Sequence, residues 1–91
     1  MSRTYLVECY SPDPTAPADA VVRLTTATRE LRDLRVEFLD GMVLPGDDVA
    51  FYRFSATDPA AVLEVCVAAR VSVSRVSEYV LVAGPVSAPA R

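Results

Sequence analysis

The sequence has no histidine and only two cysteines among its 91 residues. Without histidine no Ser-His or Cys-His pair can form, which excludes covalent hydrolysis by such a nucleophile. Nickel and zinc sites favour imidazole ligands. Because Cys9 and Cys66 with carboxylates are a poor replacement, we expect no metal. The three glycines form no phosphate-binding loop, and we expect no cofactor.

Basic residues and long apolar runs are also scarce. Nine basic against twelve acidic residues give a net charge of -3, which argues against binding to nucleic-acid phosphates. No apolar run approaches the roughly 18 residues of a membrane span, and the N-terminus lacks a signal-peptide pattern. Cys9 and Cys66 lie among apolar neighbours, which favours two small buried thiols over a disulfide. We expect a soluble cytoplasmic protein whose partners are neither nucleic acid nor membrane.

The β-branched and aromatic run from Thr4 to Tyr10 predicts a buried central strand. This run contains Glu8, and a carboxylate in an apolar strand is costly unless it is paired, hydrogen-bonded or facing a wet cavity. The following residues 11–17 hold three prolines and are typical of a connector. Glu8 is therefore the first residue that needs a functional or structural reason.

Strand and helix patterns alternate along the rest of the chain. Thr15 can cap a helix, Pro45-Gly46 predicts a type II turn, and Asp58-Pro59 marks the start of a second helix. The predicted elements are, in order, strand 4–10, helix 17–34, strand 36–44, strand 49–55, helix 58–70 and strand 71–82.

This order predicts a ferredoxin-like βαββαβ fold of the α+β class, in which two helices cover one face of a four-stranded antiparallel sheet. We expect one domain over residues 1–82 and a flexible C-terminal tail over 83–91. The first and third strands are then central, which places Glu8 and Arg53 near each other in the sheet.

Strand parity predicts which side chains the helices cover and which face outward. The covered set is expected to be Tyr5, Val7, Cys9, Ala50, Tyr52, Phe54, Ser77, Tyr79 and Leu81. The outward set is expected to be Leu6, Glu8, Tyr10, Phe38, Asp40, Met42, Phe51, Arg53, Val76, Glu78 and Val80. A bulge at Gly41 is the alternative that would move Asp40 to the covered side.

Two compatible explanations account for an outward face that is too apolar to be left bare. In the first, two copies pack face to face as a homodimer, and Arg53 pairs with Glu8 or Glu78. In the second, the space between the sheets is also a cavity for a hydrophobic small molecule. Proton transfer there requires a raised carboxylate pKa, so at least one of Glu8, Glu78 and Asp40 is expected to have a pKa well above about 4.

Four short motifs follow one another along the chain: Tyr5-Leu6-Val7-Glu8, Leu44-Pro45-Gly46-Asp47, Phe54-Ser55-Ala56 with Asp58-Pro59-Ala60-Ala61-Val62, and Arg75-Val76-Ser77-Glu78. Over most of residues 4–82 they resemble the domain of unknown function 4242 family, which implies a ferredoxin-like dimer of the α+β barrel kind. Members are often labelled nickel-binding. That label depends on histidine ligands, so the metal role is not carried over. Glu8 and Glu78 match recurring acids of the family, whereas Cys9 stands where relatives often have arginine.

The remaining chemistry available to these residues is general acid/base catalysis by carboxylates. The candidate catalytic residues are Glu8, Glu78, Arg53 and Asp40, with Arg53 or a tyrosine stabilising an enolate. The candidate substrate-binding residues are Leu6, Tyr10, Phe38, Met42, Phe51, Val76 and Val80. The sequence thus leads to a cofactor-free enzyme that isomerises, cyclises or dehydrates a hydrophobic metabolite held between the sheets of a dimer.

Two other classes of function use the same fold. A non-catalytic small-molecule-binding or sensor protein would use the same cavity without proton transfer, and the sequence does not separate it from the enzyme. Glu8 and Glu78 would then be dimer salt bridges and Tyr10 a packing residue. An RNA-binding module could use an exposed Phe51, but the acidic balance and the missing basic cluster argue against it.

Overall fold

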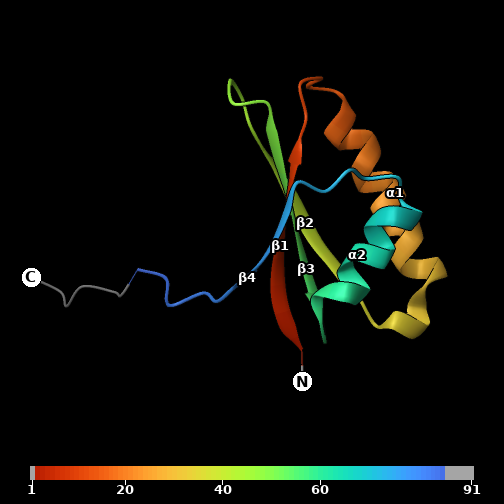
Figure 1. The fold of residues 1–91 in the computed structure, drawn as a ribbon. Helices are drawn as coiled ribbons and strands as arrows, with labels where there is room; N and C mark the ends of the chain where they lie inside the picture. Colours follow the sequence, from red (N-terminus) through yellow and green to blue (C-terminus); the bar gives the residue numbers. More distant parts are fainter. Residues whose placement is uncertain (1, 86–91) are drawn as a thin grey trace, which may run out of the picture.

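The computed structural model describes residues 2–85 and shows a sheet with two helices on one side (Figure 1). Its elements are β1 (Arg3–Tyr10), α1 (Ala16–Glu30), β2 (Glu37–Leu44), β3 (Val49–Ala56), α2 (Pro59–Ala68) and β4 (Arg75–Tyr79), with a short 3-10 helix (Arg32–Leu34) after α1. The predicted βαββαβ order is therefore confirmed. Residues 86–91 of the predicted tail lie outside the described residues.

The four strands form one antiparallel sheet in the order β2-β3-β1-β4, so β1 and β3 are central as predicted. Both helices cover the same face of this sheet, and the opposite face is uncovered (Figure 1). We call the uncovered side the open face.

Local sequence signals explain where the elements begin. The Asp58 side chain accepts a hydrogen bond of 2.9 Å from the backbone N–H of Ala61, and Pro59 occupies the first turn of α2. Gly46 has a φ of 94°, which the predicted type II turn between β2 and β3 requires. Thr15 is the N-cap of α1, but its side chain makes no capping bond. Its hydroxyl instead donates 2.8 Å to Asp13.

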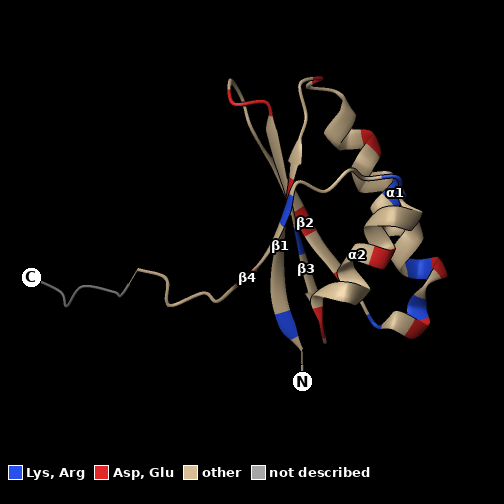
Figure 2. Cartoon of the chain, viewed as in Figure 1, with Lys and Arg blue, Asp and Glu red and all other residues tan. Residues whose placement is uncertain are grey.

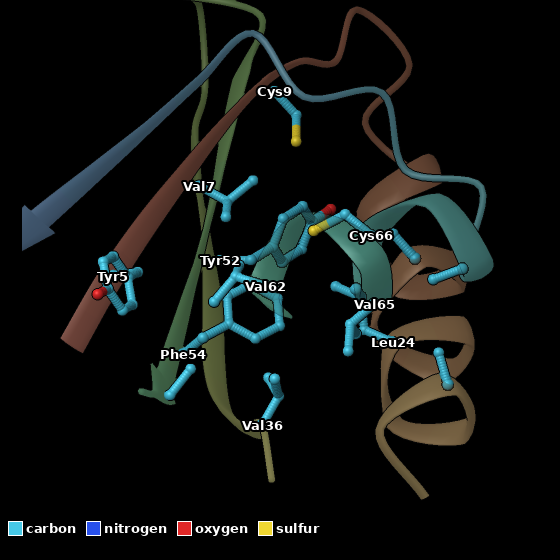
Figure 3. Packing of buried hydrophobic residues seen from close by; sticks show 14 of the residues in the cluster. Tyr5, Val7, Cys9, Leu24, Val36, Tyr52, Phe54, Val62, Val65 and Cys66 are labelled. Atoms are coloured by element: carbon cyan, nitrogen blue, oxygen red, sulfur yellow. The ribbon is translucent and has the colours of Figure 1, made fainter. Parts of the chain in front are cut away.

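The core lies between the sheet and the helices (Figure 3). Alternate residues of β1 and β3 are buried there, as parity predicts, and α1 and α2 contribute the other half. The largest fully buried side chains are Phe54, Leu24, Val7, Val62, Val65 and Cys66. Cys9 and Cys66 are both buried and free, and burial raises their thiol pKa values to about 11 and about 12.

The register of β4 differs from the prediction. Val76 pairs with Val7, whose side chain the helices cover, so Val76 and Glu78 lie on the covered side and Tyr79 on the open face. β4 is also shorter than the predicted 71–82, because only residues 75–79 pair with β1. At the end of this pairing the Thr4 hydroxyl donates a hydrogen bond of 2.5 Å to the carbonyl of Tyr79.

β2 contains an irregularity between Phe38 and Asp40 that shifts its parity. Phe38 pairs with Phe54 on the covered side, their ring centroids 5.4 Å apart, and not on the open face as predicted. Asp40 and Met42 do lie on the open face. Gly41 has a different role, because a Cβ there would lie 2.9 Å from the Tyr52 ring. The glycine lets that ring pack against the strand.

Substituting Gly41 by alanine therefore tests this close contact. The added methyl group forces the buried Tyr52 ring to move, and we expect the free energy of unfolding to fall by about 1–3 kcal/mol in urea titrations. Gly84→Ala is the matched control, since nothing lies within 4 Å of its added Cβ. Equal changes in the two variants would contradict this packing.

Candidate functional site

The open face combines apolar side chains with a small number of charges. The register places on it Leu6, Glu8, Tyr10, Asp40, Met42, Leu44, Val49, Phe51, Arg53, Arg75, Ser77 and Tyr79. Among these, Met42 and Leu44 are exposed, whereas Leu6, Phe51 and Tyr79 are half-buried within the sheet surface. This is a larger apolar surface than a free sheet face usually exposes to water.

A hollow of about 420 Å³ lies on this face across all four strands. It is lined by Leu6, Asp40, Gly41, Met42, Arg53, Tyr79 and Leu81. We call it the open-face hollow. Four of the residues predicted for the site, Leu6, Asp40, Met42 and Arg53, meet there. Tyr10 lies outside it and is largely exposed near the end of β1.

Arg53 is the polar centre of the hollow. Its Nε donates 2.6 Å and its Nη2 2.5 Å to the two oxygens of Asp40, which forms a two-pronged ion pair across β2 and β3. Its Nη1 donates 3.3 Å to the Tyr79 hydroxyl, and its guanidinium lies 5.9 Å from the centroid of that ring. Arg53 is thus oriented by the neighbouring strand β2 and by β4, which lies two strands away.

The ion pair makes Asp40 the nearest acid of Arg53, whose charge is expected to lower the pKa of its neighbour. Hydrogen bonds from Arg53 hold the pKa of the Asp40 carboxyl below its ordinary value, not above it. A carboxylate held ionised by a bidentate guanidinium is a poor proton donor near neutral pH. Asp40 therefore positions Arg53 and does not meet the requirement for a general acid.

Glu8 lies half-buried on the open face of the central strand β1, two residues after Leu6 of the hollow, and does not itself line the hollow. In the register it stands opposite Phe51 of β3 and Arg75 of β4. Within residues 2–85 Glu8 forms no ion pair, and Arg53 bonds Asp40 instead of the predicted Glu8 or Glu78. Glu8 is the open-face carboxylate that the single chain leaves available.

Four predicted site residues do not belong to this site. Glu78 lies on the covered side at the edge strand, where its Oε1 is 3.7 Å from Nη1 of Arg3. Val76 packs against the core, as does Phe38 of β2. Val80 follows the end of β4 and is exposed, so the structure does not bring it to the hollow.

Sequence reasoning missed Tyr79 and Arg75. The β4 parity predicted from the sequence is off by one residue, which turned Tyr79 toward the helices, and no face was predicted for Arg75. The alternating Ser-Val-Ser-Arg-Val-Ser-Glu-Tyr pattern has apolar residues of both parities, and only the pairing with β1 resolves them. Tyr79 is the missed residue that matters most, because it contacts Arg53 directly.

The segment after β4 carries apolar side chains away from the domain. Val80, Leu81 and Val82 are 76%, 77% and 96% exposed. The chain leaves the sheet on the side opposite the helices (Figure 1). Its apolar side chains therefore lie on the side of the open face.

The part of the chain that the structure describes offers no group of three or more Cys, Asp or Glu side chains arranged to hold a metal ion. Neither helix in residues 2–85 has the length and apolar character needed to cross a membrane.

Comparison with known proteins supports the fold but gives no information about the function. No protein-family model matches the chain, and no curated protein gives a significant match. The crystal structure of SCO4226 from Streptomyces coelicolor A3(2) is similar to it, with a TM-score of 0.67 and 16% sequence identity. The match covers 88% of this chain and 99% of that one, so it supports the ferredoxin-like fold throughout.

Because the pKa of Asp40 is lowered in the folded state, the stability of the protein should depend on pH. The Asp40–Arg53 pair stabilises the fold above the unfolded carboxyl pKa of about 4, and this contribution is lost as the pH falls through the lower folded pKa. We measure the thermal midpoint of wild type and Asp40→Asn from pH 6 to pH 2.5. The midpoint of Asp40→Asn should be lower at pH 6, and this difference should shrink below about pH 4.

Asp33→Asn is the control, because Asp33 is exposed and forms no ion pair among the described residues. Its difference from wild type is expected to change little with pH. A deficit of Asp40→Asn that stays constant across this range would show that the ion pair does not stabilise the folded state.

Proposed function

We propose that the protein is a homodimeric small-molecule-binding protein in which two open faces pack together and enclose the open-face hollow. The single observation that carries this proposal is the hollow itself, a concave site on an otherwise uncovered apolar sheet face, with Arg53 and Tyr79 converging on it. Membership of the domain of unknown function 4242 family, which the sequence motifs resemble, is part of the same proposal.

The apolar side chains of the open face support the proposed dimer. Covering several hundred Å² of apolar surface on each subunit contributes more than about 10 kcal/mol at about 25 cal/mol per Å², against association costs of about 4–15 kcal/mol. A second copy can supply that cover by twofold symmetry. The exposed Val80, Leu81 and Val82 leave on this side and are available to extend the interface.

The lining of the hollow indicates what it binds. A volume of about 420 Å³ is within the range of small-molecule pockets, about 300–1,000 Å³. Leu6, Met42 and Leu81 provide apolar contacts, while the Tyr79 hydroxyl and the remaining donors of Arg53 provide polar ones. A hydrophobic metabolite with one hydrogen-bond-accepting group, such as a carbonyl, fits this combination.

Binding without catalysis is favoured over the acid/base enzyme that the sequence leads to. Of the three predicted carboxylates, Asp40 is engaged by Arg53, and Glu78 lies on the covered side. Acid/base chemistry with separate acid and base groups needs two titratable groups in different environments, and of these three carboxylates only Glu8 lies on the open face without an ion pair within residues 2–85.

Native mass spectrometry of the purified protein tests both parts of the proposal. We expect a dimer carrying a co-purified compound of a few hundred daltons that is released on denaturation. A purely monomeric, ligand-free protein at micromolar concentration would overturn it.

Charge placed on the open face should separate the subunits. Met42 is 47% exposed there, and Met42→Glu puts two carboxylates into an apolar interface, so light scattering after size exclusion should show monomers. Leu63→Glu is the matched control, because Leu63 is 41% exposed on the outer side of α2, away from the open face. If both variants dissociate to the same extent, or if only Leu63→Glu does, the interface does not lie on the open face.

Proton transfer remains a second candidate because of Glu8. It is half-buried on the open face, on the central strand β1, and would be covered further between two sheets. In a dimer, the Glu8 of each subunit could act as base or acid on a ligand oriented by Arg53, in an isomerisation, cyclisation or dehydration.

The substitution Glu8→Gln distinguishes the two candidates. Once the co-purified compound is identified, its conversion is followed by NMR with wild type, Glu8→Gln and the control Glu78→Gln, which makes the same change on the covered side. An enzyme using Glu8 should lose roughly 100-fold in rate in Glu8→Gln and little in Glu78→Gln. If wild type converts nothing, or Glu8→Gln keeps its full rate, the catalytic candidate is excluded.

A further inference from the structure

A second cavity lies at the end of the sheet, remote from the open-face hollow. It measures about 160 Å³ and is bounded by the end of β1, the start of α1 and the loop that follows α2. Ser11, Arg23, Tyr52, Arg70 and Ser72 provide its polar lining. We call it the end cavity. Its volume is below the about 300 Å³ of a typical metabolite pocket but equals that of about five water molecules.

The end cavity holds uncompensated positive charge. Arg23 and Arg70 both line it, none of its lining residues is acidic, and within residues 2–85 neither arginine forms an ion pair. The nearby Asp13 carboxylate accepts hydrogen bonds from the backbone and hydroxyl of Thr15. Two arginines that share a cavity without a carboxylate, in a protein with more acidic than basic residues, leave a site that favours an anion.

Arg23 is held in place at this cavity. Its Nε donates 2.7 Å to the carbonyl of Ala69 at the end of α2, so its guanidinium is fixed beside the loop that carries Arg70. Arg23 also lowers the pKa of Tyr52, against a larger rise caused by burial, which places its charge near the tyrosine hydroxyl. Figure 3 shows the Tyr52 ring reaching from β3 toward Cys66, with the hydroxyl at its far end.

Arg70 occupies a backbone position where glycine is the usual residue. The N–H of Arg70 bonds the carbonyl of Val67 and that of Val71 bonds Cys66, which is the Schellman ending of a helix. The residue after the C-cap then has a left-handed backbone, and Arg70 has a φ of 58°. An arginine in place of glycine costs stability here, as it does at Arg35, which has a φ of 56°. Figure 2 marks the arginines in blue and the acidic residues in red along the chain.

We propose that the end cavity binds a small oxyanion, a phosphate or carboxylate group, held by the guanidinium groups of Arg23 and Arg70 and by hydroxyl donors of Tyr52, Ser11 and Ser72. Guanidinium groups offer paired N–H donors that match the oxygens of such anions. This site is independent of the proposed dimer and of the open-face hollow, with which it shares no residue.

The test is a titration of the full-length protein with inorganic phosphate at constant ionic strength, followed by amide NMR. We expect saturable shifts at Ser11, Arg70 and Ser72. Arg23→Gln and Arg70→Gly are each expected to weaken phosphate binding at least about tenfold, because each removes charge-assisted hydrogen bonds. Tyr52→Phe removes one hydroxyl donor and keeps the ring, so a smaller loss is expected.

Arg70→Gly is expected to raise stability and to weaken phosphate binding, a combination that a purely structural role for Arg70 would not produce. Glycine relieves the left-handed backbone, so the thermal midpoint should rise by roughly 4 °C while phosphate binding is lost. Arg35→Gly is the matched control, because Arg35 also has a left-handed backbone, with a φ of 56°, but does not line the cavity. It should gain stability similarly and keep the wild-type affinity.

Shifts that do not saturate, or an equal loss of affinity in Arg35→Gly and Arg70→Gly, would overturn the proposal in favour of diffuse attraction to surface arginines.

Acetate and methyl phosphate, titrated in parallel, identify the source of the oxyanion. Preference for inorganic phosphate over methyl phosphate assigns the site to the free ion, and the reverse assigns it to an esterified phosphate. Saturable binding of acetate alone assigns it to a carboxylate group. The Met42→Glu variant should bind phosphate as wild type does, so the two proposals fail separately.

Discussion

The alternation of buried and half-buried side chains along β3 is the constraint on which the structure depends. Tyr52 and Phe54 point to the helices and Phe51 and Arg53 point away, and the pairing with β1 and β2 transmits this parity to both neighbours. Because two helices cover one face only, the same alternation that fills the core also creates the apolar open face. The core and the candidate binding surface are therefore two consequences of one pattern.

Arg53 shows how that surface becomes a site. Its position in a central strand brings it within reach of Asp40 on one neighbour of β3 and of Tyr79 two strands away. The resulting contacts hold a guanidinium at the floor of an apolar hollow, where few polar groups can orient a ligand. The arginines of the end cavity are positioned differently. The Arg23 side chain donates a hydrogen bond to a backbone carbonyl, and Arg70 is the residue with a left-handed backbone that follows the end of α2.

The fold, the strand order and the faces of β1 and β3 could be predicted from the sequence, because the charged Glu8 and Arg53 mark the outward parity of these strands and the residues of the other parity are apolar. It could not locate the irregularity next to Leu39, since Phe38 and Leu39 are both apolar and either could face the core. The register of β4 was equally hidden, because an edge strand that mixes serine with valine carries no parity signal. Those two errors displaced Phe38, Val76 and Glu78 and concealed Tyr79. The end cavity was missed because its residues are far apart in the chain and form no motif.

The central claim is that a second copy covers the open face, and isotope-filtered NMR of a half-labelled sample tests it most directly. Protein labelled with ¹³C and ¹⁵N is mixed with unlabelled protein, and only contacts between subunits are recorded. The account predicts such contacts from the methyl group of Met42 and the rings of Phe51 and Tyr79. Contacts that arise instead from Leu63 and Val67 on the outer side of α2, or none from any residue, would contradict it.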